Sequence, residues 1–303
     1  MPRPEEFRAT AELLGLMGVA RGRVASESEI QADAVACERG LAQGELCLVL
    51  EHRQQIAGVF WGILCRANAA EQLECYLTSV ILRPELRTRG LGSRYLRHWE
   101  HCLGPLGVRA ITLNFMAANG RVASFYRRLG YEHAGYDLLA PFENLVEAPE
   151  PESLSSPALP TIRSYEPADA PWVAAQLYER QALKDFEHPF WSRSEIDSEL
   201  QALAHDANQT LLLAERGSVP CGLCWALFKL SRQGAPIAVA RCFEGDGTST
   251  AGVLLDALKG FAASRRAKES YVTLWEPCTA ALELALARGY AVGRYKLSKR
   301  LVA

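Results

Sequence analysis

Two arginines and two glycines stand together in Arg87-Thr88-Arg89-Gly90-Leu91-Gly92, between a strand-like segment and a helix-like segment. A turn of this kind directs several backbone N–H groups to one point, and the dipole of the following helix adds partial positive charge. The glycines let the backbone approach an anion closely, and the arginines supply full charges. The pattern predicts a pyrophosphate-binding turn. The alternative is a tight turn whose arginines are only solvated.

The turn differs from two common phosphate-binding motifs. A Walker loop needs Gly-Lys-Ser/Thr, and a dinucleotide fingerprint needs a third glycine where Tyr95 stands. The elements that must position the turn are a strand over Tyr76–Leu82, which Pro84 ends, and a helix that follows. The expected helix has one apolar face, made of Leu91, Tyr95, Leu96, Trp99 and Leu103.

The chain has 303 residues, of which 49% are hydrophobic, and this is enough for about two domains with packed cores. Residues 143–160 are rich in Pro, Glu and Ser, which is typical of a linker. The segments on either side end alike, in a helix, a Gly-Tyr pair and a strand, with Gly130-Tyr131 and Gly289-Tyr290 as the two pairs. We therefore predict an α/β (α+β) protein with two copies of one unit, at residues 1–142 and 161–303.

The first copy differs from the second at its start. The second opens on a strand near residues 162–166, whereas residues 1–15 resemble a helix. We expect the first unit either to borrow a strand, from the linker or from a partner, or to close its sheet without one.

The residues around the turn resemble the GNAT superfamily of acyl-CoA-dependent N-acyltransferases. In that family a strand that ends in an x-Val-x-Pro-like step leads to Arg/Gln-x-x-Gly-x-Gly/Ala and a helix; here Val80–Pro84 is followed by Arg87–Gly92. The next family motif is an Asn, a helix with a Tyr, and a Gly-aromatic pair, matched here by Asn119, Tyr126 and Gly130-Tyr131. The resemblance covers residues 45–140 well and the second copy in outline. It implies two tandem GNAT-fold domains, each a mixed, mostly antiparallel sheet flanked by helices.

The resemblance implies a role for each matched position, with acetyl-CoA as the acyl donor and no metal. Backbone groups of Val80, Ile81 and Leu82 would pair with the pantetheine arm, and Asn119 would hold that arm. Tyr126 would protonate the leaving thiolate. The pyrophosphate would lie against the turn, which comprises Arg87, Thr88, Arg89, Gly90, Leu91, Gly92 and Ser93.

Two of these assignments have structural alternatives. Tyr126 belongs to an apolar helical stripe, so the alternative is that it is a core aromatic. For Asn119 the alternative is that it only caps the helix that follows. Many family members have a Glu where Tyr76 stands here. Glu74, two residues earlier, is either the general base, acting through a water, or a solvated residue at the strand edge. By simple alternation, Glu74 shares a strand face with Thr78 and Val80.

The second copy lacks the chemistry of the first. Counting back from Gly289, Ala285 replaces Tyr126 and Cys278 replaces Asn119. The best alignment of the turn gives Asp246–Ala251, with an acid where Arg87 stands. We predict a degenerate GNAT-like domain that keeps the fold without the transfer activity.

The function expected from these features is transfer of an acetyl group from acetyl-CoA to a primary amine of a small molecule or peptide, by direct attack in the first domain. The alternative is a non-catalytic CoA-binding sensor or protein-interaction module. The net charge of −2 argues against a general nucleic-acid binder. Without a signal-peptide pattern or a long apolar run, we expect a cytoplasmic monomer or homodimer that does not engage a membrane. Cys221-Gly-Leu-Cys224 lies in a strand-like run, so we expect its thiols on opposite faces.

Overall fold

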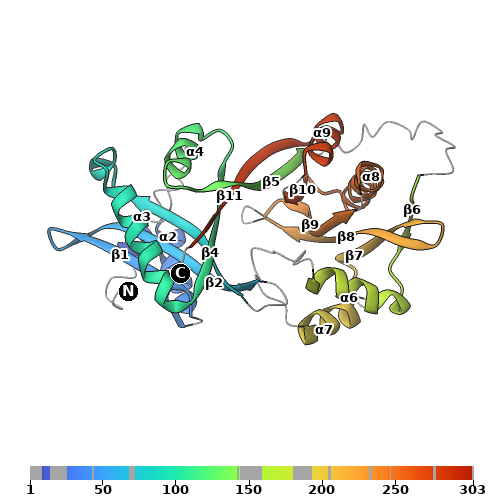
Figure 1. Ribbon diagram of the computed structural model, residues 1–303, viewed down its shortest axis with the longest axis horizontal. Helices are drawn as coiled ribbons and strands as arrows, with labels where there is room; N and C mark the ends of the chain where they lie inside the picture. The colour runs from blue at the N-terminus through green and yellow to red at the C-terminus, as the bar shows by residue number, and fades with distance from the viewer. Residues whose placement is uncertain are drawn as a thin grey trace.

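The computed structural model describes residues 9–13, 26–42, 44–67, 72–141, 143, 159–179, 193–203, 206–231, 234–245, 247–275 and 278–301 (Figure 1). The strands are β1 (Leu46–His52), β2 (Gln55–Ala67), β3 (Gln72–Leu82), β4 (Val108–Met116), β5 (Glu132–Pro141), β6 (Thr161–Ser164), β7 (Gln209–Arg216), β8 (Val219–Leu230), β9 (Pro236–Gly245), β10 (Glu269–Trp275) and β11 (Ala291–Arg300). The helices are α2 (Glu27–Ala42), α3 (Leu91–Leu103), α4 (Gly120–Arg127), α6 (Ala170–Glu179), α7 (Arg193–Leu203), α8 (Thr248–Ser264) and α9 (Thr279–Ala287). Most of the expected linker, residues 144–158, lies outside the described residues.

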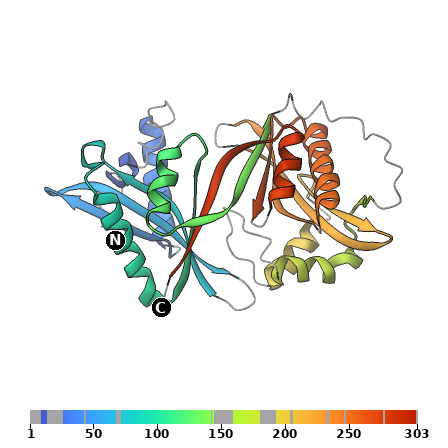
Figure 2. The ribbon, with the colours of Figure 1, turned by 45° about the horizontal axis from the view of Figure 1, so that its top comes forward.

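The described strands form one 11-stranded sheet in the order β1-β2-β3-β4-β11-β5-β10-β9-β8-β7-β6. Only the β3–β4 and β9–β10 pairings are parallel, so the predicted mixed, mostly antiparallel sheet is confirmed. Helices α3 and α4 pack on one face through a cluster that includes Leu96, Trp99 and Tyr126. Helices α8 and α9 continue on that face, while α6 and α7 cover the opposite face of the second half (Figure 2). None of the described helices is both long enough and apolar enough to span a bilayer.

The two halves, residues 1–142 and 161–303, share their last strands. In the first half, β5 does not pair with β4; β11 from the second half lies between them and pairs with both. The arrangement is reciprocal, because β5 lies between β11 and β10 and pairs with both (Figure 2). This exchange does not supply the missing first strand: among the described strands none lies beyond β1, where β6 lies beyond β7 in the second half, so no borrowing from the linker is seen and the described sheet ends there without that strand. In the described part of residues 1–15, residues 9–13 are helical as expected.

A buried ion pair joins the shared strands. Lys296 Nζ on β11 lies 2.9 Å from Asp137 Oδ1 on β5, and the two side chains are 2% and 12% exposed. Asp137 also accepts hydrogen bonds from Thr273 Oγ1 on β10 and Asn114 Nδ2 on β4, at 2.8 and 3.3 Å. The ammonium lies 5.0 Å from the centroid of a Trp275 ring. A buried carboxylate needs such partners because water no longer solvates it. Four strands from both halves thus meet at one polar cluster.

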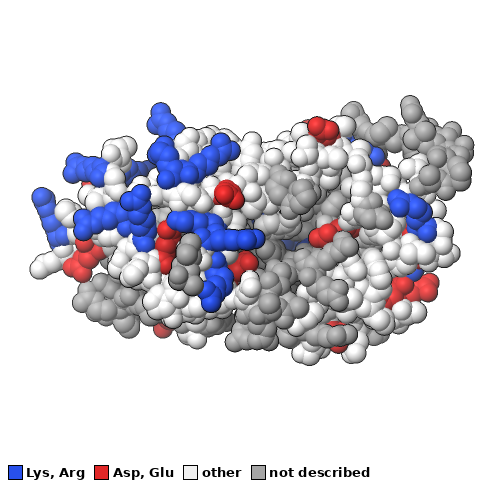
Figure 3. Space-filling view, viewed as in Figure 1, with Lys and Arg blue, Asp and Glu red and all other residues white. Residues whose placement is uncertain are grey.

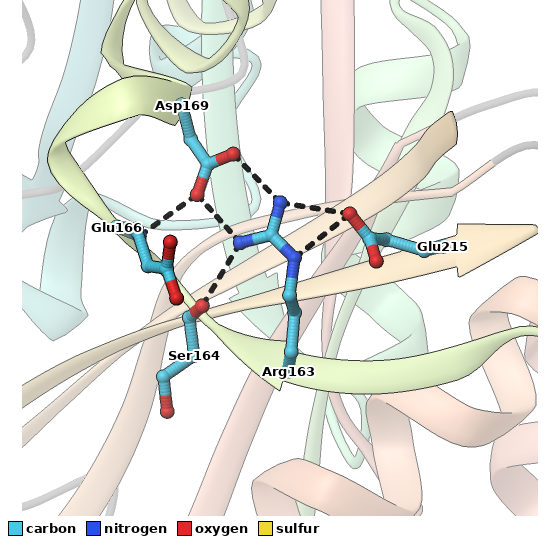
Figure 4. Close-up of polar contacts among 5 residues, drawn as sticks. All are labelled: Arg163, Ser164, Glu166, Asp169 and Glu215. Atoms are coloured by element: carbon cyan, nitrogen blue, oxygen red, sulfur yellow. Dashed lines mark hydrogen bonds and ion pairs between the residues drawn. The ribbon is translucent and has the colours of Figure 1, made fainter. Parts of the chain in front are cut away.

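A second ion network anchors the start of the second half (Figure 4). The Arg163 guanidinium on β6 donates to both carboxylate oxygens of Asp169, at 2.6 and 2.7 Å, and to Glu215 Oε1 on β7 at 2.7 Å. Asp169 also accepts the backbone N–H of Glu166, as part of a capping box just before α6. The network therefore fixes the first turn of α6 against the edge of the sheet.

This network predicts a pH dependence of stability. The hydrogen bonds from Arg163 hold the pKa of Asp169 below its usual value. A carboxyl whose pKa is lowered on folding stabilises the protein above its unfolded-state pKa of about 3.9, and that contribution fades as pH falls below this value. We expect Asp169→Asn to lower the free energy of unfolding by about 1–3 kcal/mol at pH 6 and by clearly less at pH 3, measured by urea denaturation. The exposed Asp197→Asn is the control; an equal loss at both pH values contradicts the prediction.

The Cys-x-x-Cys pair departs from the expected alternation. Cys221 lies at a register shift between β7 and β8, and both it and Cys224 pack against the core beneath α8 and α9, so the expectation of opposite faces is wrong. The bulge inserts one residue and reverses the parity of the strand. Burial raises the pKa of the Cys224 thiol to about 12, which disfavours the thiolate that redox or metal chemistry requires.

Candidate functional site

The first half contains a gap between two parallel strands. Strands β3 and β4 pair only from Leu73–Val108 to Leu77–Leu113, and β3 then continues to Leu82 without β4 beside it. The separation begins at a β-bulge, because Leu77 pairs with Gly62 and Ser79 with Trp61 on β2, leaving Thr78 unpaired. The Thr78 hydroxyl donates to the Trp61 carbonyl at 3.0 Å and holds the bulge in place.

The open edge of β3 presents backbone groups to this gap. Arg83 N–H donates to the Ala57 carbonyl at 2.9 Å, which fixes the phase of the β2–β3 ladder. Because an antiparallel ladder alternates, Ile81 pairs back to β2, while Val80 and Leu82 turn their N–H and C=O groups towards the gap. An extended amide-containing chain fits such an edge as an added strand.

The bulge also changes which side chains of β3 share a face of the sheet. Cys75 and Leu77 pack beneath α3. Val80 packs there too, although it lies three residues after Leu77 and simple alternation would place it on the opposite face. Glu74 and Tyr76 therefore face the other side of the sheet, and the expectation that Glu74 shares a face with Val80 is wrong. The extra residue at Thr78 reverses the alternation.

The basic turn lies where the sequence places it, between β3 and α3. Gly90 is the N-cap of α3, with a φ of 75°, and no side chain caps the helix. The first intrahelical bond from this turn is made by Arg94 N–H to the Gly90 carbonyl, so the N–H groups of residues 91–93 remain available. No heavy atom lies within 4 Å of a Cβ built on Gly90. Arg87 Nε donates to the Leu82 carbonyl at 2.9 Å, which ties the turn to the end of β3. The turn therefore offers unbonded backbone donors beside two arginines, an arrangement that suits an anion.

Positive charge surrounds this turn. Arg87 and Arg89 are exposed, and further exposed arginines lie on α3, on α4 and just after it, at Arg94, Arg97, Arg121, Arg127 and Arg128. None of the seven forms an ion pair with a described acidic residue. Lys and Arg side chains gather over the first half in the space-filling view, and fewer lie over the second half (Figure 3). The field at the site therefore favours a polyanion.

Asn119 and Tyr126 lie on the helix beside the turn. Gly92 at the start of α3 faces Phe125, with 3.5 Å between its built Cβ and the ring, so the start of α3 lies against the last turn of α4. Asn119 is the N-cap residue of α4, but its side chain is exposed and makes no capping hydrogen bond. The capping role is therefore absent, and the amide is free to contact a ligand.

Tyr126 is 7% exposed and packs edge-on against Phe125 and Tyr131. Its hydroxyl forms no hydrogen bond with the described residues, and it is not among the fully enclosed polar atoms, which include the Tyr131 hydroxyl. Burial raises the pKa of Tyr126 above its usual value, so the phenol stays protonated at neutral pH. The ring belongs to the core, as the structural alternative expects, and the hydroxyl can still donate a proton.

Glu74 is not brought together with these residues. It is half-buried on the paired part of β3, facing away from α3 and α4, and it lies four residues before the bulge. At about 3.3 Å per residue, this separates it from the bulge by roughly 13 Å along the strand. Glu74 can serve only a group that approaches from the opposite face of the sheet. Within the described residues, no three His, Cys, Asp or Glu side chains are grouped to hold a metal ion.

Two residues that sequence reasoning missed lie at the start of the gap. Thr78 forms the bulge, and Asn114 is the first residue of β4 beyond the pairing with β3. Asn114 lies on the same face as Glu74 and bonds to Asp137 of the shared-strand cluster. No local pattern marks either residue, because both are defined by pairing between distant strands.

The second half keeps the gap and the bulge but not the turn. Strands β9 and β10 pair only up to Val239 and Tyr271, and Arg241 takes the bulge position. However, α8 begins at Thr248, directly after the cap residue Gly247, so Gly247 takes the place of Gly90, and the predicted alignment, which set Ser249 there, is wrong by two residues. Asp246 lies outside the described residues. The first turn of α8 is packed down, with Thr250 fully buried.

The helix that follows β10 confirms the other predicted equivalences. Cys278 is the N-cap of α9, as Asn119 is of α4. Tyr290 N–H bonds to the Ala285 carbonyl as Tyr131 N–H bonds to that of Tyr126. Ala285 is fully buried, so no hydroxyl occupies this position in the second half.

Comparison with known proteins agrees with this geometry. Residues 43–133 match the family model of an acetyltransferase (GNAT) domain. The whole chain is similar to the structure of a GCN5-related N-acetyltransferase from Sphaerobacter thermophilus, with 19% identity and a TM-score of 0.61, covering 100% of this chain and 95% of the other. It is also similar to a tandem GNAT protein from the clavulanic acid biosynthesis pathway, with 12% identity and a TM-score of 0.56, covering 99% and 96% of the two chains. At these identities, the structural likeness establishes the fold.

Proposed function

From the presence of a GNAT acetyltransferase domain in residues 43–133, we propose that the first half transfers an acyl group, acetyl by family default, from acyl-CoA to a primary amine. The family implies the acyl-CoA donor. The observation that carries the proposal is the joint placement of an uncapped helix N-terminus, a basic turn and an open strand edge around one gap. The acceptor is a small-molecule or peptide amine. We further propose that residues 1–142 form the catalytic domain, 143–160 the linker and 161–303 a degenerate domain.

Each part of the gap has a physical task. The N–H groups at the start of α3, with Arg87 and Arg89, hold the pyrophosphate. The edge of β3 at Val80 and Leu82 pairs with the amide-bearing arm, and Asn119 holds that arm from the other side. The Leu82 N–H is a candidate donor to the thioester carbonyl as negative charge develops there.

The thioester of the donor supplies the activated acyl group. The neutral amine forms the new C–N bond, the C–S bond breaks, and the thiolate takes the proton of the Tyr126 hydroxyl. The amine loses a proton on attack, and we assign its removal to Glu74 acting through water from the opposite face. Water exchange then returns a proton to Tyr126.

We propose that the second half does not transfer acyl groups. Between β9 and α8 there is room only for residues 246 and 247, where the first half has residues 83–90. Ala285 and Cys278 offer neither a phenol nor an amide at the positions of Tyr126 and Asn119.

Thiol release from acetyl-CoA in the presence of a panel of primary amines tests the proposal. We expect turnover with at least one amine. The double variant Arg87→Ala/Arg89→Ala should raise the KM for acetyl-CoA by about 10- to 100-fold, with a weaker dependence of KM on salt, because charge-assisted bonds to phosphate are lost.

Arg266→Ala, an exposed arginine of the second half, is the matched control and should leave KM unchanged. Binding of acetyl-CoA without turnover of any amine would refute the enzymatic proposal and favour a CoA-sensing protein instead.

A further inference from the structure

Asn114 lies at the start of the gap in the first half, because it is the first residue of β4 beyond the pairing with β3. Its neighbours Leu113 and Phe115 both pack on the face of the sheet that carries α3 and α4, so the Asn114 side chain lies on the other face. The acyl donor is assigned to the side of α3 and α4. An acceptor that reaches the gap from the opposite side therefore passes Asn114.

A hydrogen bond to Asp137 fixes the orientation of the Asn114 amide. Asn114 Nδ2 donates to Asp137 Oδ2 at 3.3 Å, and Asp137 Oδ1 lies 2.9 Å from Lys296 Nζ. A carboxylate that pairs with an ammonium accepts hydrogen bonds and donates none, so the NH2 group of the amide must face it. Asp137 is on β5, beyond β11, whereas the gap is on the other side of β4. The carbonyl oxygen of the amide is therefore turned away from Asp137 and left for the gap.

This carbonyl oxygen is available to a ligand. Asn114 is half-buried, and its Oδ1 forms no hydrogen bond with the described residues. It is also not among their fully enclosed polar atoms. An amide oxygen that is neither bonded nor enclosed can accept an N–H group from a molecule in the gap.

The second half has a matched residue that bonds to the same carboxylate. By the spacing that relates Asn119 to Cys278 and Tyr126 to Ala285, Thr273 on β10 corresponds to Asn114. Thr273 also lies just beyond a parallel pairing, since β9 and β10 pair only up to Tyr271. Its hydroxyl donates to Asp137 Oδ1 at 2.8 Å. Both positions thus support Asp137, and the one in the first half adds a carbonyl oxygen beside the basic turn and Tyr126.

The chemistry of this oxygen suits an attacking amine. A primary amine attacks a thioester through its lone pair, so it has to be held through its N–H groups. Asp137 and Lys296 balance each other's charge, and a neutral carbonyl oxygen does not favour the ammonium form as a carboxylate would. We propose that Asn114 Oδ1 binds the acceptor by accepting an N–H group of its amine. This inference rests on acyl transfer by the first half, and it places the amine between Glu74 and the open edge of β3.

Steady-state kinetics of the whole chain test the proposal, with acetyl-CoA and the amine that the panel identifies. Asn114→Leu has nearly the same size and lacks the carbonyl oxygen. We expect it to lower kcat/KM for the amine by about 10- to 100-fold, the loss typical of one missing hydrogen bond to the substrate. The KM for acetyl-CoA should stay within about threefold, because the contacts assigned to the donor lie elsewhere.

Thr273→Val is the matched control. It removes a hydrogen bond to the same carboxylate from the equivalent position, so urea denaturation should show a similar loss of stability in both variants. Because Thr273 does not face the gap of the first half, its replacement should leave kcat/KM for the amine within about threefold of wild type.

Three results overturn the proposal. In the first, Asn114→Leu keeps kcat/KM for the amine within about threefold of wild type; in the second, Thr273→Val loses as much as Asn114→Leu does. In the third, Asn114→Leu raises the KM for acetyl-CoA as strongly as it impairs use of the amine. Each of these is seen in variants of an active enzyme. A wild type without turnover refutes acyl transfer itself and this inference with it, so the two failures are distinguishable.

Discussion

Replacing Tyr126 with phenylalanine should lower kcat for acyl transfer by about 10²- to 10⁴-fold, the range expected when a general acid is lost. The KM for acetyl-CoA should change little, because the contacts assigned to the donor lie on β3, on the turn and at Asn119. The ring would keep its edge-on packing against Phe125 and Tyr131, so folding should be retained. Thiol release with the amine found in the panel measures both constants.

The pH profile gives this prediction a second readout. Burial holds the pKa of Tyr126 above its usual value of about 10, so its acid form persists through the neutral and mildly alkaline range. For the wild type, we therefore expect no fall in kcat below about pH 10 from deprotonation of the acid. Tyr95→Phe, a half-buried tyrosine on α3, is the matched control and should stay within about threefold of wild type. If Tyr126→Phe also stays within threefold, Tyr126 is only a core aromatic.

The sharing of strands decides which experiments can locate the active half. Removing residues 161–303 would delete β11 and leave a gap between β4 and β5. Removing residues 1–142 would delete β5 and open the same kind of gap beside β10. In either case loss of activity would report a broken sheet. Point variants at Arg87 and Tyr126 avoid this difficulty, because neither of these residues lies on a shared strand.

Much of the local structure was predictable because it depends on short-range patterns. The apolar face expected on the helix after the turn is buried at Leu96, Trp99 and Leu103. The caps of α4 and α9 and the buried Tyr126 and Ala285 follow from the same count back from each Gly-Tyr pair. Helix periodicity and a fixed turn are properties of neighbouring residues, so one sequence suffices to find them.

The features that were missed depend on pairing between distant strands. The bulge at Thr78 exists only relative to Trp61 and Gly62 on β2, and no residue type marks it in the sequence. The predicted face of Glu74 was wrong for this reason. The place of β11 was equally hidden, because its pairing with β4 and β5 joins segments that are far apart in the sequence. The predicted alignment of the turn in the second half was wrong as well. The segment between β9 and α8 is shortened, and this shows only in the residue at which α8 begins.

The buried pair of Lys296 and Asp137 should control the stability of the whole chain. Removing one partner by Lys296→Met leaves a buried carboxylate uncompensated, which typically costs about 3–5 kcal/mol in free energy of unfolding. Asp137→Leu should cost a similar amount, because it strands the ammonium and also removes the acceptor used by Thr273 and Asn114. Urea denaturation at pH 7 measures each loss.

The double variant Lys296→Met/Asp137→Leu is the informative control. Replacing both charges with apolar groups removes the unpaired charge, so the double variant should be more stable than either single variant by at least about 1 kcal/mol. Because the pair joins β11 to β5, and Asp137 reaches β4 and β10 as well, all variants should unfold in one transition rather than half by half. Two separate transitions would show that the halves fold independently, and additive losses in the double variant would show that the two side chains are not coupled. The single 11-stranded sheet argues against that result, since neither half can keep its inner edge paired alone.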